Sequence, residues 1–294
     1  MNTNRFIQQA VQVNIPFDML QASYLDRFIQ RRLNPEIRLD AGTLEHGTPG
    51  DFKAIADRLH REKLRVTLHA PYVDLSAGST DPAVRELTRR RFQQVLDLVP
   101  LFRPLSVVCH AGYDAKYHQF YLEHWTRFSV DLWSWLAQKL REQGTYLMLE
   151  NVYEHEPSEI AVLLKPLREL QVGLCLDTGH CAAFARTPLD PWIDMLGGYI
   201  RQLHLHDNNG TWDDHMALGS GRIDFSPLIR FLRSRNGLPP ITTIENHREV
   251  DLDRSFTYLQ HHWPPSALRL PSASNDMDVG GPTATKSDRL LSAG

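Results

Sequence analysis

Short apolar runs alternate with longer amphipathic segments over most of this chain. The clearest run covers residues 172–176, and the polar sequence Asp177-Thr-Gly-His follows it directly. A run of this length, closed by glycine, is too short for a helix and is typical of a buried strand. Seven other runs have the same character, so strands are predicted at residues 11–15, 36–39, 64–68, 105–109, 145–149, 172–176, 200–205 and 241–244.

Segments with helical periodicity separate these strands. They cover residues 20–33, 51–63, 81–99, 117–143, 157–170, 191–196, 225–235 and 251–263. Eight strands alternating with helices predict parallel pairing in a closed (β/α)8 TIM barrel of the α/β class. We therefore expect one barrel domain over residues 1–263. Residues 264–294 are rich in Pro, Ser, Ala and Gly, so a disordered tail is predicted there.

Composition narrows the possible partners. The 294 residues carry a net charge of −3, which gives no general attraction to nucleic acid or to an anionic membrane. No apolar run reaches the roughly 18 residues of a membrane span, and residues 1–10 lack the apolar centre of a signal peptide. The three cysteines, an odd number, favour reduced thiols. We therefore expect a cytoplasmic protein with a small-molecule substrate, and an oligomer is possible.

Acids and histidines stand where the predicted strands end. All carboxyl ends of the strands face one mouth in a TIM barrel, so these residues are expected to converge. Three carboxylates in one mouth cannot all stay ionised without a cation between them. Together with one imidazole they form a mixed oxygen and nitrogen site suited to divalent Zn, Mn, Co or Fe. The four predicted ligands are Glu150, Asp177, His204 and Glu245.

A second set of histidines and acids could hold further ions. His69 and His110 end neighbouring predicted strands and could share Glu150, whereas His180, Asp213 and His215 lie in loops that follow other strands. One to three ions are therefore expected, although a single strand histidine is more often hydrogen-bonded than metal-bound. Asp214 is an alternative ligand to Asp213. His206 shares a strand face with His204 and could be a ligand, a donor to a ligand or a contact of the substrate.

Six short motifs, taken together, resemble the xylose isomerase-like TIM-barrel superfamily. They are Leu-His-Ala-Pro-Tyr at 68–72, Cys-His-Ala-Gly at 109–112, Leu-Glu-Asn at 149–151, Cys-Leu-Asp-Thr-Gly-His at 175–180, Leu-His-Leu-His-Asp-Asn at 203–208 and the segment 213–221. The resemblance covers about residues 11–263. Sugar isomerases and epimerases of this group use a Glu, Asp, His, Glu metal site, which falls on Glu150, Asp177, His204 and Glu245. The endonuclease IV branch has a trinuclear zinc site whose additional ligands fall on His69, His110, His180, Asp213 and His215.

The first hypothesis is a metal-dependent isomerase or epimerase of a small sugar or sugar-like carbonyl compound. The metal would polarise a carbonyl, and Glu150 and Glu245 would exchange a proton through an enediolate. Arg222 is the candidate for holding a substrate oxygen or phosphate. The expected substrate contacts are Tyr72, His206 and Trp212.

The alternative is a zinc-dependent phosphodiesterase that acts on abasic DNA or another phosphodiester. The chain departs from the endonuclease pattern at Gly179, where that branch has Cys, and at His206, where it has Asn. The predicted strand-to-helix loops also supply few cations to meet phosphates, namely Lys116, Arg186, Arg222 and Arg248, and many acids. This balance favours the small-sugar branch. A barrel that binds a metabolite without catalysis is a third hypothesis.

Overall fold

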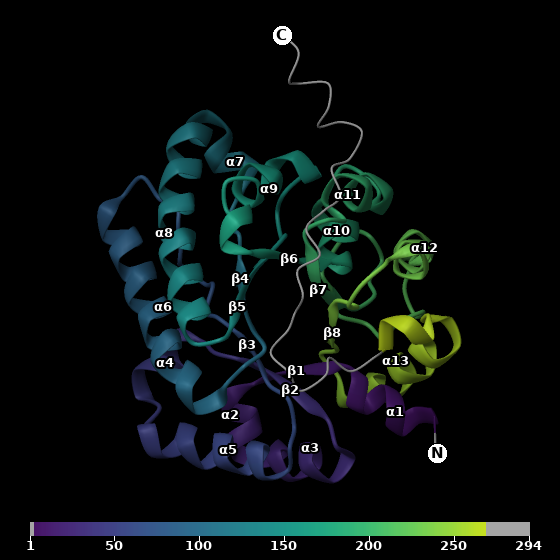
Figure 1. Cartoon of the computed structure of the whole chain (residues 1–294). Helices are drawn as coiled ribbons and strands as arrows, with labels where there is room; N and C mark the ends of the chain where they lie inside the picture. The colour runs from purple at the N-terminus through teal and green to yellow at the C-terminus, as the bar shows by residue number, and fades with distance from the viewer. Residues whose placement is uncertain (1–2, 269–294) are drawn as a thin grey trace.

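A computed structural model describes residues 3–268 of the chain, with side chains from residue 6 onwards. Eight parallel strands form a closed barrel in chain order, from β1 next to β2 through to β8 next to β1. Figure 1 shows helices packed around these strands, as the alternation of short apolar and longer amphipathic segments predicted. The strands are β1 (Gln12–Pro16), β2 (Asn34–Arg38), β3 (Thr67–His69), β4 (Ser106–His110), β5 (Tyr146–Glu150), β6 (Gly173–Asp177), β7 (Ile200–Leu205) and β8 (Ile241–Ile244).

The strand register brings the polar strand ends to one level. His110 on β4 pairs with Glu150 on β5, and Asp177 on β6 pairs with His204 on β7. Arg38 on β2 pairs with His69 on β3 in the same way. Each predicted strand is present: β7 and β8 have the predicted ends, and the ends of the other six differ by one to three residues. The fold class predicted from the sequence is therefore confirmed.

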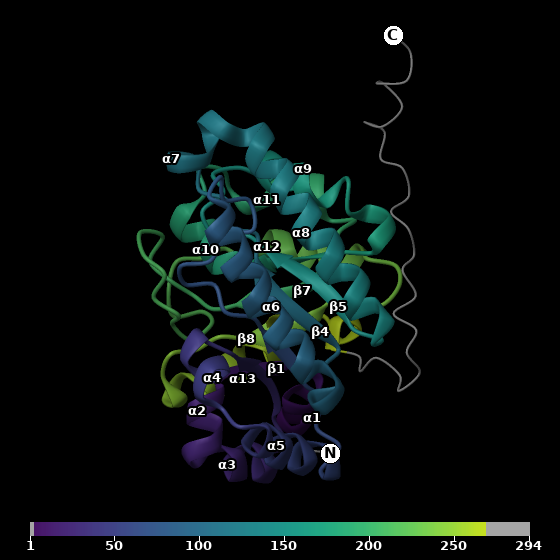
Figure 2. The same cartoon turned by 90° about the vertical axis from the view of Figure 1, so that its left-hand side faces the viewer.

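The outer layer holds the helices that connect the strands, and Figure 2 shows them from the side. The long ones are α5 (Pro49–Arg61), α6 (Pro82–Phe102), α8 (Leu122–Glu142) and α13 (Glu249–His262). The shorter ones are α1 (Thr3–Ala10), α2 (Phe17–Met19), α3 (Leu25–Arg31), α4 (Ala41–His46), α7 (Ala115–His118), α9 (Pro157–Leu164), α10 (Thr178–Phe184), α11 (Leu189–Leu196) and α12 (Ser226–Ser234).

Four helices, α1, α2, α4 and α10, lie where the sequence analysis expected none, and the predicted helices 117–143 and 157–170 are divided. The helix predicted at 157–170 ends as α9 at Leu164 and is followed by the 3₁₀ turn η3 (Arg168–Leu170). A π-helical turn, η1 (Leu20–Tyr24), separates α2 from α3, and the 3₁₀ turn η2 (Gln119–Tyr121) separates α7 from α8. Tyr121 has φ −129° and ψ 23°, outside the helical region, so the predicted helix 117–143 cannot be continuous.

Acids at strand ends explain two of the unexpected helices. The Asp40 carboxylate accepts a hydrogen bond from the N–H of Thr43 at 2.6 Å and so caps α4. Asp177 accepts one from the N–H of His180 at 2.7 Å and caps α10. A side-chain oxygen at this position satisfies a helical N–H that otherwise lacks a partner. Asp40 is therefore a cap, whereas Asp177 both caps a helix and faces the mouth.

The ordered chain continues past the expected domain boundary at residue 263. Pro265–Leu268 form a 3₁₀ turn, η4, and the side chains of Ala267 and Leu268 are buried in the core. These residues, which were expected in the tail, belong to the fold because their apolar side chains are covered. The predicted disorder of residues 269–294 lies outside the described residues. Over residues 3–268, every helix is too short or too polar to span a bilayer.

Candidate metal centre

Four side chains from four consecutive strands meet at the barrel mouth. His204 Nδ1 lies 3.2 Å from Glu150 Oε1, 3.4 Å from Glu245 Oε1 and 4.0 Å from Asp177 Oδ2. All four residues are buried, and each offers one possible ligand atom within 4.8 Å of the others. The convergence predicted from the strand ends is therefore present in the fold. We refer to these residues as the central group.

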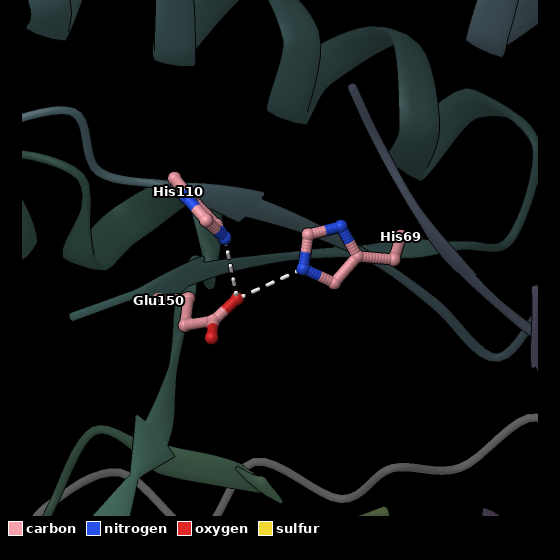
Figure 3. A group of neighbouring side chains, drawn as sticks. All are labelled: His69, His110 and Glu150. Atoms are coloured by element: carbon pink, nitrogen blue, oxygen red, sulfur yellow. Dashed lines mark hydrogen bonds and ion pairs between the residues drawn. The ribbon is translucent and has the colours of Figure 1, made fainter. Parts of the chain in front are cut away.

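Two histidines face Glu150 Oε2, the carboxylate oxygen that His204 does not contact. His69 Nε2 lies 3.0 Å from Glu150 Oε2, and His110 Nε2 lies 3.5 Å from the same oxygen. Figure 3 shows both imidazoles pointing at this one atom from neighbouring strands. His69 Nδ1 is 2.9 Å from the carbonyl oxygen of Ala70, which leaves Nε2 for the mouth. His69, His110 and Glu150 form a second possible cation group, and Glu150 belongs to both.

A third group lies on the other side of Asp177. His206 Nε2 is 3.3 Å from Asp177 Oδ1 and 3.3 Å from Asp213 Oδ1. Asp213 Oδ2 in turn lies 3.4 Å from His180 Nε2 and 3.0 Å from His215 Nε2. Asp177, His180 and His206 have ligand atoms within 4.8 Å of one another. All nine predicted ligands therefore lie in one connected cluster, and His206 joins it as a tenth candidate.

Several buried polar atoms of this cluster lack hydrogen-bond partners among the described residues. They are Asp177 Oδ2, Asp213 Oδ1 and both ring nitrogens of His206. A buried polar atom without a partner costs about 1–3 kcal/mol, and proteins seldom retain such atoms without compensation. Carboxylate oxygens and imidazole nitrogens are ligands for Zn and for other divalent transition metals. The residues present therefore fit a divalent metal, with the cation supplying the missing partners.

The two glutamates of the central group have opposite pKa shifts. Burial would raise the pKa of Glu150, but the charges of His204 and His110 outweigh it and hold that pKa well below its usual value. For Glu245, burial raises the pKa by more than the charge of His204 lowers it, and the charge of Glu150 adds to the rise. Two carboxyls of one pocket therefore differ in their readiness to release a proton.

Gly179 makes room for the His206 ring. A Cβ atom at position 179 would lie 1.8 Å from His206 Cε1 and 2.2 Å from His206 Nε2. No side chain at 179 can coexist with this imidazole unless one of them moves. The two departures from the endonuclease pattern, glycine at 179 and histidine at 206, are therefore physically linked. Together they add an imidazole between Asp177 and Asp213.

Sequence reasoning missed Glu36, which is completely buried beneath the mouth. Glu36 Oε1 lies 2.9 Å from His204 Nε2, on the ring edge opposite the central group. Glu36 Oε2 accepts hydrogen bonds from side chains of three other strands, namely Thr67 at 2.9 Å, Gln202 at 2.6 Å and Thr243 at 3.0 Å. The available signal was a glutamate inside a short strand otherwise predicted to be buried. Such a residue requires polar partners.

The predicted substrate contacts divide between two places. Tyr72 and Trp212 line the mouth, a cavity of about 330 Å³ that also exposes Glu150 and Glu245. The Tyr72 ring stacks on His110 with ring centres 4.1 Å apart. His206 is fully buried and does not line this cavity, so it belongs to the cluster and not to the substrate surface.

Arg222 lies away from the mouth, contrary to its predicted role. It lines a separate cavity together with Arg186 and Asp224. The cause is Asp207, whose carboxylate accepts hydrogen bonds from the N–H groups of Gly219, Gly221 and Ile223 at 2.9–3.1 Å. These bonds fold the glycine-containing loop 219–223 down beside β7. The loop motif therefore has a structural role, and Arg222 is carried away from the cluster.

Comparison with protein families agrees with the fold and the site described above. The model of the xylose isomerase-like TIM barrel family matches residues 33–260. The chain therefore belongs to this family, as the six motifs indicated.

Three similar proteins are informative. The TTHB071 protein from Thermus thermophilus, whose crystals were soaked with ZnCl2, is 26% identical, with a TM-score of 0.72 over 86% of this chain and 97% of that one. A D-tagatose 3-epimerase-like protein shares the fold at 20% identity, with a TM-score of 0.72 and the same coverage. Fructoselysine 3-epimerase of Escherichia coli O157:H7 is 26% identical over 164 residues, which are 52% of this chain and 59% of that protein.

Proposed function

We propose that this protein is a divalent-metal-dependent isomerase or epimerase of a small sugar or sugar-like carbonyl compound. The main support for this proposal is that Glu150 and Glu245 both line the mouth and both lie within 3.4 Å of His204 Nδ1. Two carboxyls facing one pocket can remove and return a proton at the same carbon. The similarity to fructoselysine 3-epimerase supports this reaction class.

Glu150, Asp177, His204 and Glu245 would hold the metal in this proposal. A bound divalent ion would polarise a substrate carbonyl and its neighbouring hydroxyl. Zn, Mn and Co are the candidates, because the donor set mixes carboxylates with an imidazole. Glu36 fixes the His204 ring from the far side, in the manner of a carboxylate that orients a ligating histidine.

The proton transfer falls to the two glutamates. One removes the proton from the carbon next to the carbonyl, which gives an enediolate, and the other returns a proton to that carbon or its neighbour. Asn14 donates a hydrogen bond to Glu245 Oε1 at 2.7 Å and keeps that carboxyl turned towards the mouth. Tyr72 and Trp212 provide apolar walls that limit the access of water to the reacting carbon.

Solvent exchange tests the proposal directly. Metal-loaded protein is incubated with a panel of ketoses in deuterated water, and mass spectrometry measures the incorporated deuterium. We expect incorporation in at least one ketose and a loss of about 10²–10⁴-fold in rate for Glu150→Gln and Glu245→Gln. Glu86→Gln makes the same chemical change at an exposed position on α6, away from the mouth, and is the matched control. If every ketose stays free of solvent deuterium, the proposal is wrong.

A second candidate is a zinc-dependent phosphodiesterase related to endonuclease IV. The observation that favours it is the additional ligand groups, His69 with His110 and His180 with Asp213 and His215, in contact with the central group. Two or three neighbouring ions are typical of phosphodiester hydrolysis. Cleavage of an abasic-site duplex by the zinc-loaded protein would establish this candidate. An uncut duplex would exclude the endonuclease version.

A further inference from the structure

Arg38 brings a guanidinium to the candidate metal centre. It is the last residue of β2, and it lies in register with His69. Among the described residues that line the mouth, it is the one arginine or lysine. Side chains alternate along a strand, so Arg38 points to the same side as Glu36 but one step nearer the opening. The sequence analysis did not single it out, because it considered cations in the loops and not on the strands.

The Arg38 guanidinium has no partner among residues 6–268. No carboxylate lies within 4.0 Å of it, and no described group hydrogen-bonds to its side chain. A guanidinium stays charged at any physiological pH and presents five N–H donors. Arg38 is also partly buried, which makes an unpaired charge at this place costly. An anion that arrives with the substrate would remove this cost.

Neighbouring arginines show that unpaired cations are not general on this side of the barrel. Arg27 contacts Glu249 at 2.5 Å, Arg31 contacts Asp253, and Arg248 lies 3.7 Å from Asp251. These three arginines and Arg38 line a side cavity of about 190 Å³ next to the mouth. Arg38 alone among them lines both cavities. It therefore stands where the mouth, with its reacting groups, adjoins a second space large enough for a substituent, and we call this place the passage.

Uncharged polar groups surround the same passage. Asn14, Asn246 and His247 also line both cavities. The His247 ring stacks on His215 with centres 4.0 Å apart, and its nitrogens have no described hydrogen-bond partner. An anionic group beside Arg38 could accept hydrogen bonds from these side chains as well. Charge-assisted bonds from a planar guanidinium suit a phosphate or a carboxylate.

We propose that Arg38 binds an anionic group, a phosphate ester or a carboxylate, on the sugar-like substrate. This inference rests on the proposed isomerase or epimerase function and specifies its substrate class. The anionic group would lie in the passage between the two cavities, with the carbonyl end of the substrate at Glu150 and Glu245. Arg38 is thus a residue for binding and specificity, and the proton transfers do not require it.

Three ketoses with the same six-carbon skeleton test the proposal by calorimetry on the metal-loaded full chain. D-fructose carries no charge, D-fructose 6-phosphate carries a phosphate ester, and D-fructuronate carries a carboxylate. We expect at least one anion to bind about tenfold or more tightly than D-fructose. Whichever anion has the larger preference identifies the chemical source of the charge.

The variants separate Arg38 from general electrostatics. Arg38→Gln should abolish the preference for the anion and leave D-fructose binding within about twofold, whereas Arg38→Lys should retain part of it. Arg248→Gln removes a cation of the side cavity that does not line the mouth, so it should keep the preference. Equal thermal midpoints for the three variants confirm that each one folds.

Two results would overturn the inference. The first is that neither anion binds more tightly than D-fructose to the wild-type protein. The second is a preference that survives Arg38→Gln, because the metal centre itself would then hold the anion. Both results concern binding alone, so they leave the deuterium exchange test of the proposed activity unaffected.

Discussion

The contact between Gly179 and His206 shows how one missing side chain defines a site. The imidazole occupies the volume that a Cβ atom at 179 would need, and the backbone of α10 is held by the Asp177 cap. Neither partner can move without disturbing the other. This coupling of residues 27 positions apart was invisible in the sequence, where glycine and histidine were two separate departures from a pattern.

Substitution at 179 tests this coupling. Gly179→Ala should destabilise the protein by about 1–3 kcal/mol, because the new methyl group overlaps a buried ring. The double variant Gly179→Ala with His206→Asn should lose less than the sum of the two single changes. Urea unfolding measures all three. Gly50→Ala, where the nearest atom lies 3.6 Å from the new Cβ, is the control and should have little effect. Additive losses in the double variant would show that the residues are independent.

Glu154 gives a prediction on pH. Burial raises its pKa from 4.5 to about 7, and Oε1 has no hydrogen-bond partner among the described residues. The folded state therefore binds this proton more tightly than the unfolded state. Its contribution to stability is complete below pH 4.5 and falls as pH rises through 7. Glu154→Gln should thus stabilise the protein at pH 8 by roughly 2 kcal/mol and change little at pH 4. Equal effects at both pH values, measured by urea unfolding, would contradict this assignment.

At the scale of elements, the loop after β7 depends on one carboxylate. Asp207 binds the N–H groups of Gly219, Gly221 and Ile223, and its backbone pairs with Met216. The same loop carries Asp213 and His215 into the cluster. The hydrogen bonds of Asp207 therefore determine how the loop after β7 folds, and this loop brings Asp213 and His215 to the cluster.

Removal of the Asp207 carboxylate should make the positions of Asp213 and His215 less well fixed. Asp207→Ala is expected to cost about 2–4 kcal/mol of stability, since several buried N–H groups lose their acceptor. Zinc affinity should fall about 10–100-fold, as for other groups that orient ligands. Competition with a chelating dye measures the affinity. Asp224→Ala, which removes an exposed hydrogen bond to the N–H of Ser226 away from the cluster, is the matched control. Unchanged zinc affinity in Asp207→Ala would show that the loop does not depend on it.

The sequence predicted the elements well where short-range signals determine them. Strand positions follow from apolar runs, and α5 and α6 lie within one to three residues of the predicted ranges 51–63 and 81–99. The predictions failed where distant contacts decide. Arg222 was expected to hold a substrate oxygen or phosphate, whereas Asp207 folds its loop so that Arg222 lines a separate cavity. Arg38 and Glu36 were missed because their significance depends on side chains from other strands.

At the scale of the whole molecule, the barrel unites four possible cation groups through shared residues, the fourth being His206, His215 and Glu245. Glu150, Asp177 and Glu245 each belong to the central group and to one other. Binding of an ion to the folded state alone would stabilise it, by about 2.7 kcal/mol when the free metal is a hundredfold above its dissociation constant.

Metal content and thermal stability should therefore change together. We expect zinc or manganese to raise the midpoint of unfolding and a chelator to reverse the increase, with His204→Asn largely insensitive to both. Elemental analysis of the same samples counts the ions. One exchangeable ion agrees with the isomerase proposal, whereas three tightly held zinc ions favour the phosphodiesterase candidate. A midpoint that no divalent metal changes would contradict a metal centre.

Glu36 has a consequence for the order of events during folding. Its carboxylate joins side chains of β3, β7 and β8, and it lies 3.3 Å from Asn14 Nδ2 on β1, so its partners span the seam where the first and last strands meet. The contacts with Gln202 on β7 and Thr243 on β8 cannot form until the two ends of the polypeptide have come together. His204 acquires its fixed orientation in the same event. A chain that lacks β8 would therefore have no preorganised mouth. It should begin to bind a cation only when the barrel has closed.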